Sequence, residues 1–169
     1  MSKLFKCRLC GECCSGEMKV FLNPDDLLLL RSYLNNCSEE ELFSRNYLTW
    51  DEKSGVKQPR MKFREFQGIK FCPFLENRLE EDGTLLGLCR LHPDFKPLVC
   101  HLAPLTRTID FAADSESYGF MLPHPACPGC DPDVEDREEL SYENLADDLK
   151  RRLAREKEYF RSLWLAPGD

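Results

Sequence analysis

Four cysteines fall within eight residues near the start of the chain, and this run constrains the fold more than any other feature. The run consists of Cys7, Cys10, Cys13 and Cys14. Thiolate is a soft metal ligand, and a spacing of two residues lets a tight turn direct successive sulfur atoms at one point. In an extended backbone the side chains of Cys13 and Cys14 point to opposite sides, so that each can serve a different metal centre. The run predicts a metal site, with a redox dithiol or a chance cluster as the alternatives.

Five further cysteines stand in motif-like settings downstream. They are Cys72, which precedes a proline, the pair Cys89 and Cys100, and the pair Cys127 and Cys130 of a Cys-Pro-Gly-Cys segment. Together with the N-terminal run they supply nine thiols, which is enough for two four-thiol sites with one thiol left over. The sequence therefore predicts one or two cysteine-ligated centres.

Two kinds of metal fit this set of thiols. Zinc prefers four ligands, often from two Cys-x-x-Cys knuckles, which here are Cys7 with Cys10 and Cys127 with Cys130. An iron–sulfur cluster is the alternative, because three cysteines at two-residue spacing and a remote Cys-Pro resemble the ligands of bacterial ferredoxins. That second set is Cys7, Cys10, Cys13 and Cys72. The predicted cofactor is therefore an iron–sulfur cluster or zinc.

The three histidines all lie within three residues of a cysteine. They are His92, His101 and His124. His101 directly follows Cys100 and is the best candidate for an imidazole that replaces a thiolate at a metal. The alternative for each histidine is a hydrogen-bonding role beside the ligands. Cys37 is remote from every other thiol in the sequence, so we expect it to be a small buried apolar side chain.

The composition predicts a loop-rich domain that packing alone does not hold together. Apolar residues make up 42% of the 169 residues, beside eleven prolines, nine glycines and ten cysteines. The segment before Cys7 does not resemble a signal peptide, and no apolar stretch is long enough to span a membrane. We therefore expect a cytoplasmic protein with reduced thiols and no membrane contact. The net charge of −7 argues against nucleic-acid binding.

The secondary-structure pattern predicts a small α+β fold with two N-terminal helices, short β-hairpins and a long C-terminal helix. Helices are expected over residues 24–35, 39–48 and 141–164, with Asn23 and Ser38 as N-caps of the first two. The last helix has an apolar face suited to core packing, with partner binding as the alternative. We expect residues 1–135 to form the cysteine-cluster domain and residues 136–169 to supply the C-terminal helix packed on it.

Strands are expected around the cysteines. Residues 61–71 predict a hairpin that delivers Cys72 to the core, and residues 84–89 predict a short strand. Residues 106–112 and 118–122 predict a second hairpin, and residues 50–60 an exposed turn.

Catalytic signatures other than thiols are not found. The chain has no Walker loop, GxGxxG, nucleophile elbow or HExxH motif. The Cys127-Pro128-Gly129-Cys130 segment resembles an oxidoreductase dithiol, but it lacks the preceding strand and following helix. Whether the chain is an enzyme stays open on the sequence.

The order of the cysteine motifs resembles that of a known family. The series CxxCxxCC, Cys-Pro-Phe-Leu, Gly-Leu-Cys, Pro-x-x-Cys and Cys-Pro-Gly, over roughly residues 5–130, is similar to the CxxCxxCC cysteine-cluster family of zinc- or iron-chelating domains. The resemblance implies eight metal-associated cysteines: Cys7, Cys10, Cys13, Cys14, Cys72, Cys89, Cys100 and Cys127. Cys130 is additional to the family pattern, His92 stands where the family tends to have tyrosine, and Lys96 replaces the usual arginine.

These observations lead to a metal-binding protein with one or two cysteine-ligated centres, redox-active or catalytic. A structural zinc scaffold for a protein partner is the first alternative, since metal binding can supply folding energy to a loop-rich body. Metal storage or transfer is the second. The expected partners are metal ions and a protein.

Overall fold

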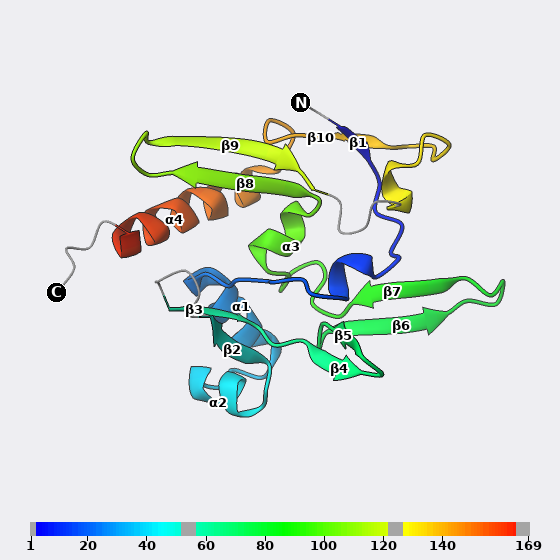
Figure 1. The fold of residues 1–169 in the computed structure, drawn as a ribbon, viewed down its shortest axis with the longest axis horizontal. Helices are drawn as coiled ribbons and strands as arrows, with labels where there is room; N and C mark the ends of the chain where they lie inside the picture. Colours follow the sequence, from blue (N-terminus) through cyan, green and yellow to red (C-terminus); the bar gives the residue numbers. More distant parts are fainter. Residues whose placement is uncertain (1–2, 52–56, 122–126, 165–169) are drawn as a thin grey trace.

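The computed structural model describes residues 3–51, 57–121 and 127–164. Short helices and paired strands follow one another along the chain (Figure 1). The helices are α1 (Pro24–Tyr33), α2 (Glu39–Ser44), α3 (Leu98–Leu102) and α4 (Asp147–Trp164), with 3-10 turns η1 (Glu12–Cys14) and η2 (Pro128–Cys130). The predicted α+β class, with two N-terminal helices and a long C-terminal helix, is confirmed.

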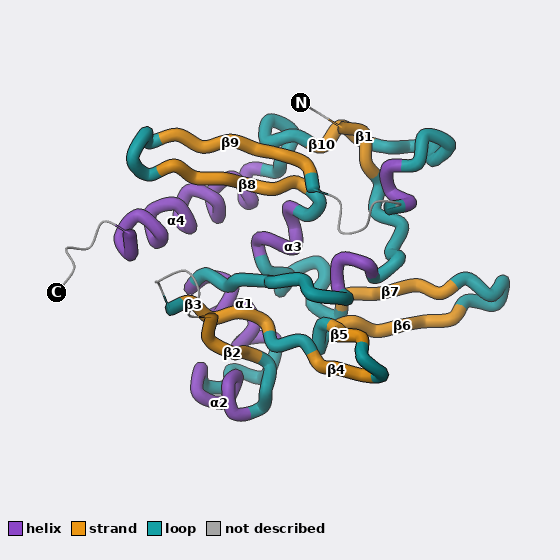
Figure 2. The backbone as a smooth tube through the Cα atoms, in the orientation of Figure 1, coloured by secondary structure: helices purple, strands orange, loops and turns teal. Residues whose placement is uncertain are grey.

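Within these residues every sheet is a single antiparallel pair of strands, and loops link the pairs (Figure 2). The pairs are β1 (Lys3–Phe5) with β10 (Glu138–Leu140), β2 (Leu48–Asp51) with β3 (Gln58–Met61), β4 (Arg64–Phe66) with β5 (Ile69–Phe71), β6 (Leu75–Leu79) with β7 (Leu85–Cys89), and β8 (Leu105–Asp110) with β9 (Ser115–Phe120). A two-stranded sheet is only marginally stable by itself in water, so each pair needs support from other parts of the fold.

The first two helices begin at the predicted capping residues. The Asn23 side chain accepts a hydrogen bond from the Asp26 N–H at 2.9 Å, and the Asp26 carboxylate accepts one from the Asn23 N–H at 3.3 Å. Ser38 and Glu41 form the equivalent box at the start of α2. Both helices end earlier than predicted, because left-handed residues follow them, with φ of 61° at Asn35 and 59° at Asn46.

The prediction of an exposed turn over residues 50–60 is wrong at both ends of that range. β2 ends at Asp51 and pairs with β3, whose first residue is Gln58. The Asp51 side chain is buried, and Lys19 and Arg60 reach its carboxylate at 3.2 Å and 3.4 Å. These cations offset the cost of burying a carboxylate, which the local composition does not reveal. Residues 52–56 lie outside the described part of the chain.

The predicted hairpins are present, with shifted ends. β4 and β5 meet at Gln67 and Gly68, which have φ of 51° and 77°, and Met61 belongs to β3 instead. The predicted strand over residues 84–89 is β7, and its partner β6 was not foreseen. β8 and β9 form the second expected hairpin.

The larger apolar core lies between α1, α2 and the first strands. Its buried members are Val20, Leu22, Leu30, Cys37, Leu42, Leu48, Met61, Phe74 and Leu91. Phe74 is fully buried, with the rings of Tyr33 and Tyr47 at centroid distances of 5.8 Å and 5.2 Å. Cys37 is 6% exposed, which confirms its predicted role as a buried apolar side chain.

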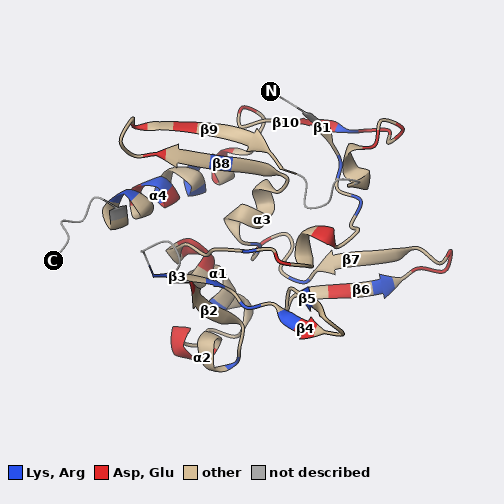
Figure 3. Cartoon of the chain, viewed as in Figure 1, with Lys and Arg blue, Asp and Glu red and all other residues tan. Residues whose placement is uncertain are grey.

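A second apolar core joins the C-terminal helix to α3 and β8. It contains Leu98, Leu102, Leu105, Leu145 and Leu153. Basic and acidic residues interleave on α4 (Figure 3), which begins at Asp147 rather than at residue 141. No helix in the described part of the chain is long and apolar enough to span a membrane.

Two ionic residues with buried side chains fix α1, α3, α4 and β8 relative to one another. The Asp26 carboxylate of α1 accepts hydrogen bonds from the Leu98 N–H at the start of α3 (2.9 Å) and from Arg152 of α4 (2.8 Å). Arg107 of β8 is paired with Glu156 of α4 at 3.2 Å. Asp26 therefore sets the position of α3, the short helix that carries Cys100 and His101.

Candidate metal centre

The N-terminal cysteine run ends in a 3-10 turn and not in an extended segment. Gly11 precedes this turn with φ of 77°, and its carbonyl accepts a hydrogen bond from the Cys14 N–H at 2.8 Å. The sulfur atoms of Cys13 and Cys14 are 4.0 Å apart. The expectation that these two thiols point to opposite sides is therefore wrong, because the alternation of an extended backbone does not apply in a helical turn.

Backbone contacts hold this run against β7 and the end of β5. Cys10 pairs with Gly87, where an added Cβ would stand 2.5 Å from the Gly11 Cα, so that only glycine allows this approach. The Cys72 N–H donates to the Cys14 carbonyl at 2.8 Å. The β4–β5 hairpin delivers Cys72 to the larger apolar core, as predicted, and also to the N-terminal run.

Five thiols gather beside the larger apolar core, and we call them the core thiol group. They are Cys13, Cys14, Cys72, Cys89 and Cys100. They come from four segments: η1, the residue after β5, the last residue of β7, and α3. Cys72, Cys89 and Cys100 are half-buried and pack against the core.

The environment of the core thiol group disfavours isolated thiolates. A hydrogen bond with Cys14, together with burial, raises the pKa of the Cys13 thiol well above its ordinary value. The hydrogen bond with Cys13 lowers the pKa of the Cys14 thiol, but the contact with Cys72, burial and the charge of Cys89 outweigh it and raise that pKa to about 12. Burial raises the pKa of the Cys100 thiol strongly as well. Cys13, Cys14 and Cys100 are therefore neutral at pH 7 unless a cation binds them.

Lys96 and His101 lie beside the core thiol group. The charge of Lys96 opposes the rise in pKa at both Cys13 and Cys100. Burial, followed by the charges of Lys96 and Arg152, lowers the pKa of His101 to about 4, so the imidazole is neutral and able to bind a metal at pH 7. The sequence analysis overlooked the electrostatic role of Lys96; its position just before Pro97-x-x-Cys100 was the available signal.

Four thiols form a second gathering, which we call the outer thiol group. They are Cys7, Cys10, Cys127 and Cys130, and the charges of the other three all act on Cys127. The Lys6 N–H donates to the Gly129 carbonyl at 2.9 Å, which brings the two Cys-x-x-Cys segments together. Cys7 and Cys10 are exposed, whereas Cys127 and Cys130 are half-buried.

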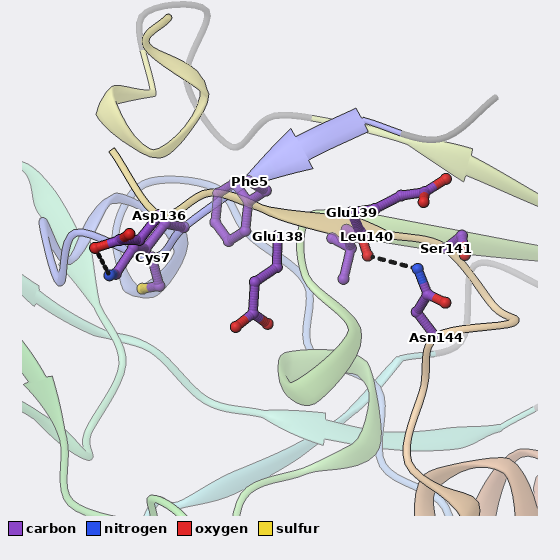
Figure 4. Close-up of a pocket in the computed structure, with 9 residues that line it drawn as sticks. Phe5, Cys7, Asp136, Glu138, Glu139, Leu140, Ser141 and Asn144 are labelled. Carbon is purple, nitrogen blue, oxygen red and sulfur yellow. Dashed lines mark hydrogen bonds and ion pairs between the residues drawn. The ribbon is translucent and has the colours of Figure 1, made fainter. Parts of the chain in front are cut away.

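The outer thiol group borders an acidic pocket of about 430 Å³ between β1 and the turn after β10 (Figure 4). Cys7 and Glu138 line it, and the Glu138 carboxylate points into it. Lys6 reaches Asp136 at 3.8 Å, and the Asn144 side chain donates to the Glu139 carbonyl at 3.1 Å. The carboxylates give this edge of the molecule a negative potential that attracts cations.

The donor set fits a thiophilic metal, although the side chains do not stand at coordinating distances. All ten cysteines lie in the described part of the chain, and all are free. Within that part, no three side chains of His, Cys, Asp or Glu already have metal-binding geometry. The 4.0 Å between the sulfur atoms of Cys13 and Cys14 is nonetheless close to the separation of about 3.8 Å that tetrahedral zinc with Zn–S bonds of about 2.3 Å requires.

Each predicted site residue can now be placed. The nine motif cysteines divide into the core and outer thiol groups, and His101 lies beside the core thiol group. His92 is exposed and acts on His101 only through its charge. His124 lies outside the described residues.

The fold and the two thiol groups define a small, cysteine-rich α+β protein. The chain matches the CxxCxxCC family, described as "Putative zinc- or iron-chelating domain", over residues 6–128. The chain therefore belongs to the CxxCxxCC family, which supports metal binding and zinc or iron as the metal. Comparisons with curated proteins and with solved structures gave no match.

Proposed function

We propose that this protein binds a metal through the core thiol group, as zinc or as an iron–sulfur cluster, in a reducing compartment such as the cytoplasm. The observation that carries the proposal is the convergence of five thiols from four separate segments. A single neutral thiol packs as a small apolar side chain, but five thiols from separate segments gathered at one place are the arrangement that a metal with thiolate ligands requires. Soft thiolates select zinc, copper(I) and iron–sulfur clusters over magnesium or calcium.

Proton release would accompany metal binding at this group. The raised pKa values of Cys13, Cys14 and Cys100 mean that the metal must displace thiol protons. Lys96 provides a fixed positive charge that partly offsets the charge of several thiolates. The core thiol group can therefore hold more thiolates around one centre than an environment without a cation could.

A structural role of the metal has direct support from the sheet topology. Cys72 lies at the entry to β6, Cys89 ends β7, and Cys100 lies in α3, so one centre would join the bases of several weakly supported elements. A bound metal supplies folding free energy that two-stranded sheets do not. In this form the protein is a metal-stabilised scaffold for a protein partner.

A reactive centre is the second candidate, favoured by the surplus of donors. A closed tetrahedral site uses four ligands, whereas the core thiol group has five thiols, and His101, whose imidazole is neutral at pH 7, directly follows Cys100. A centre that exchanges one ligand can bind a substrate or transfer electrons. The protein would then be a redox or metal-dependent enzyme.

Anaerobic purification tests the proposal. We expect bound metal in the purified protein, seen by elemental analysis, with broad visible absorbance and acid-labile sulfide if it is iron–sulfur and no colour if it is zinc. Chelation followed by circular dichroism separates the roles: loss of cooperative unfolding supports the structural role, and a folded but metal-free chain supports the reactive one. Protein that is metal-free after growth with iron and zinc would refute the proposal.

A further inference from the structure

We propose that the outer thiol group is a second metal site, a closed four-thiolate zinc site formed by Cys7, Cys10, Cys127 and Cys130, separate from the core thiol group. The inference rests on the proposed function only in that the chain binds metal through thiolates. Cys130 lies beyond residues 6–128, the part of the chain that matches the family, so the family match does not assign this site.

Each half of the site is a Cys-x-x-Cys segment in a tightly turned backbone. Cys127 precedes the 3-10 turn η2, and the Cys130 N–H donates to the Cys127 carbonyl at 3.2 Å. In the other half, Leu9 and Gly11 have φ of 54° and 77°, so the chain turns sharply on both sides of Cys10. Turns of this kind bring two thiols to one side at two-residue spacing, as zinc knuckles require.

The backbone holds the two halves side by side. The Lys6 N–H donates to the Gly129 carbonyl at 2.9 Å, directly before Cys7 and between Cys127 and Cys130. Gly129 is buried, and an added Cβ there would stand 2.5 Å from the Phe5 ring and 2.6 Å from the Lys6 carbonyl oxygen. β1 pairs with β10 just beyond this contact. The two segments therefore meet through a packed interface that does not depend on the thiols.

The four thiols also share one electrostatic environment. Cys7, Cys10 and Cys130 all lie close enough to Cys127 to act on it electrostatically. Cys7 and Cys10 are exposed, so their side chains can change rotamer toward Cys127 and Cys130 without disturbing a core. A bound cation would replace four thiol protons by four metal–sulfur bonds.

The number, type and paired Cys-x-x-Cys spacing of the donors fit zinc at this site. Four thiolates complete a tetrahedral shell and leave no position for a substrate, which is the arrangement of structural zinc sites. The site would join the N-terminal segment to residues more than a hundred positions later in the chain. Its expected role is to fasten β1 and η2 to each other, independently of the core thiol group.

The test is the metal content of matched variants of the full chain purified without oxygen. In the double variant Cys127→Ser/Cys130→Ser we expect one zinc fewer per chain, with the metal and absorbance of the core thiol group unchanged. In Cys130→His we expect zinc to be retained, because imidazole is an alternative zinc ligand of similar reach. Cys37→Ala, which removes the isolated cysteine, is the control and should retain all metal.

The inference would be overturned by unchanged zinc in the double variant, by iron in place of zinc at the outer thiol group, or by zinc loss in Cys130→His equal to that in a Cys130→Ser variant. If the double variant does not fold, the zinc content of Cys130→His compared with that of Cys130→Ser tests the inference. Wild-type protein that binds metal only at the core thiol group would refute this site and leave the proposed function intact. Wild-type protein without any metal would refute both.

Discussion

The core thiol group and the outer thiol group both consist of cysteine thiols, but the first lies against an apolar core and the second lies at the surface. The core thiol group draws on four segments, lies against the apolar core around Phe74, and has Lys96 beside it. The outer thiol group draws on two short segments and includes two exposed cysteines. The comparison shows that the spacing of the cysteines indicates where a metal can bind. The burial of the thiols and the charges beside them determine the environment that a bound metal would have.

The largest expected effect is at the core thiol group. Cys72→Ala removes the donor that lies between β5 and β6 and should weaken the binding of the core metal, because the four thiols that remain come from only three segments. A structural thiolate site carries a binding free energy on the order of 10 kcal/mol, so we expect unfolding to become easier by at least about 3 kcal/mol. Elemental analysis and denaturant unfolding measure the two effects.

The control for this prediction is Cys37→Ala, which removes a buried cysteine that lies in neither thiol group. It should cost only about 1 kcal/mol and release no metal. Equal destabilisation by the two variants, with metal retained in both, would mean that Cys72 is a packing residue.

The next effect concerns Asp26, which holds α3 and thereby Cys100 of the core thiol group in place. Burial raises the pKa of Asp26 from its ordinary 3.8 to about 6, against the opposing hydrogen bonds from the Leu98 and Asn23 N–H groups and the charge of Arg152. The folded state thus binds the Asp26 proton more tightly than the unfolded chain does. The contribution of Asp26 is most favourable below pH 4 and falls by at most about 3 kcal/mol as the pH rises to 6.

Asp26→Asn removes this contribution while keeping a side-chain oxygen for the Leu98 N–H. As the pH rises from 4 to 6, we expect the wild type to lose unfolding free energy relative to the variant. Denaturant unfolding of both proteins at matched metal content measures this difference. The comparison within each pH cancels the acid loss of metal, which is common to both proteins. A difference that does not change with pH would contradict the prediction.

A smaller effect is expected at the outer thiol group. Gly129→Ala would place a Cβ within 2.6 Å of the Lys6 carbonyl oxygen, so the two Cys-x-x-Cys segments must move apart. We expect a cost of about 1–3 kcal/mol and weaker zinc retention at the outer thiol group, with the core metal unchanged. Gly119→Ala is the control, because its Cβ would meet only the movable Thr106 hydroxyl, at 3.0 Å. Loss of the core metal in Gly129→Ala would show that the two groups are coupled.

The smallest effect is that of Lys96. Lys96→Gln removes the charge that opposes the rise in the pKa of Cys13 and Cys100, so protons compete better with the metal. We expect the apparent metal affinity of the core thiol group to fall about tenfold near pH 7, and Lys96→Arg to preserve it. Competition with a chelator across pH measures this. An equal fall at the outer thiol group would show that the effect of Lys96 is not local.

Local signals accounted for much of the fold. The N-caps Asn23 and Ser38 marked the starts of α1 and α2, and Gln67-Gly68 marked the turn of the β4–β5 hairpin. These features depend on a few neighbouring residues, so sequence patterns predict them. The ends of α1 and α2 were less predictable, because residues beyond each helix adopt left-handed conformations set by the following chain.

Pairings between distant segments could not be predicted. β1 and β10 are three residues each and lie more than a hundred residues apart in the sequence, and the burial of Asp51 depends on Lys19, which is also remote in sequence. Such contacts depend on tertiary packing and leave no periodic signal. The same holds for Asp26, whose role in placing α3 requires the Leu98 N–H and Arg152 to come from two other helices.

The sequence by itself determined the chemistry: nine motif cysteines in an order typical of the CxxCxxCC family, with donors suited to zinc or iron. Only the tertiary structure decided how those cysteines divide, with Cys14 grouped with Cys72, Cys89 and Cys100, and Cys10 grouped with Cys127 and Cys130. The physical reason is that ligand type is a property of single side chains, whereas the assignment of a thiol to one centre depends on turns and backbone contacts that bring remote segments within a few ångströms.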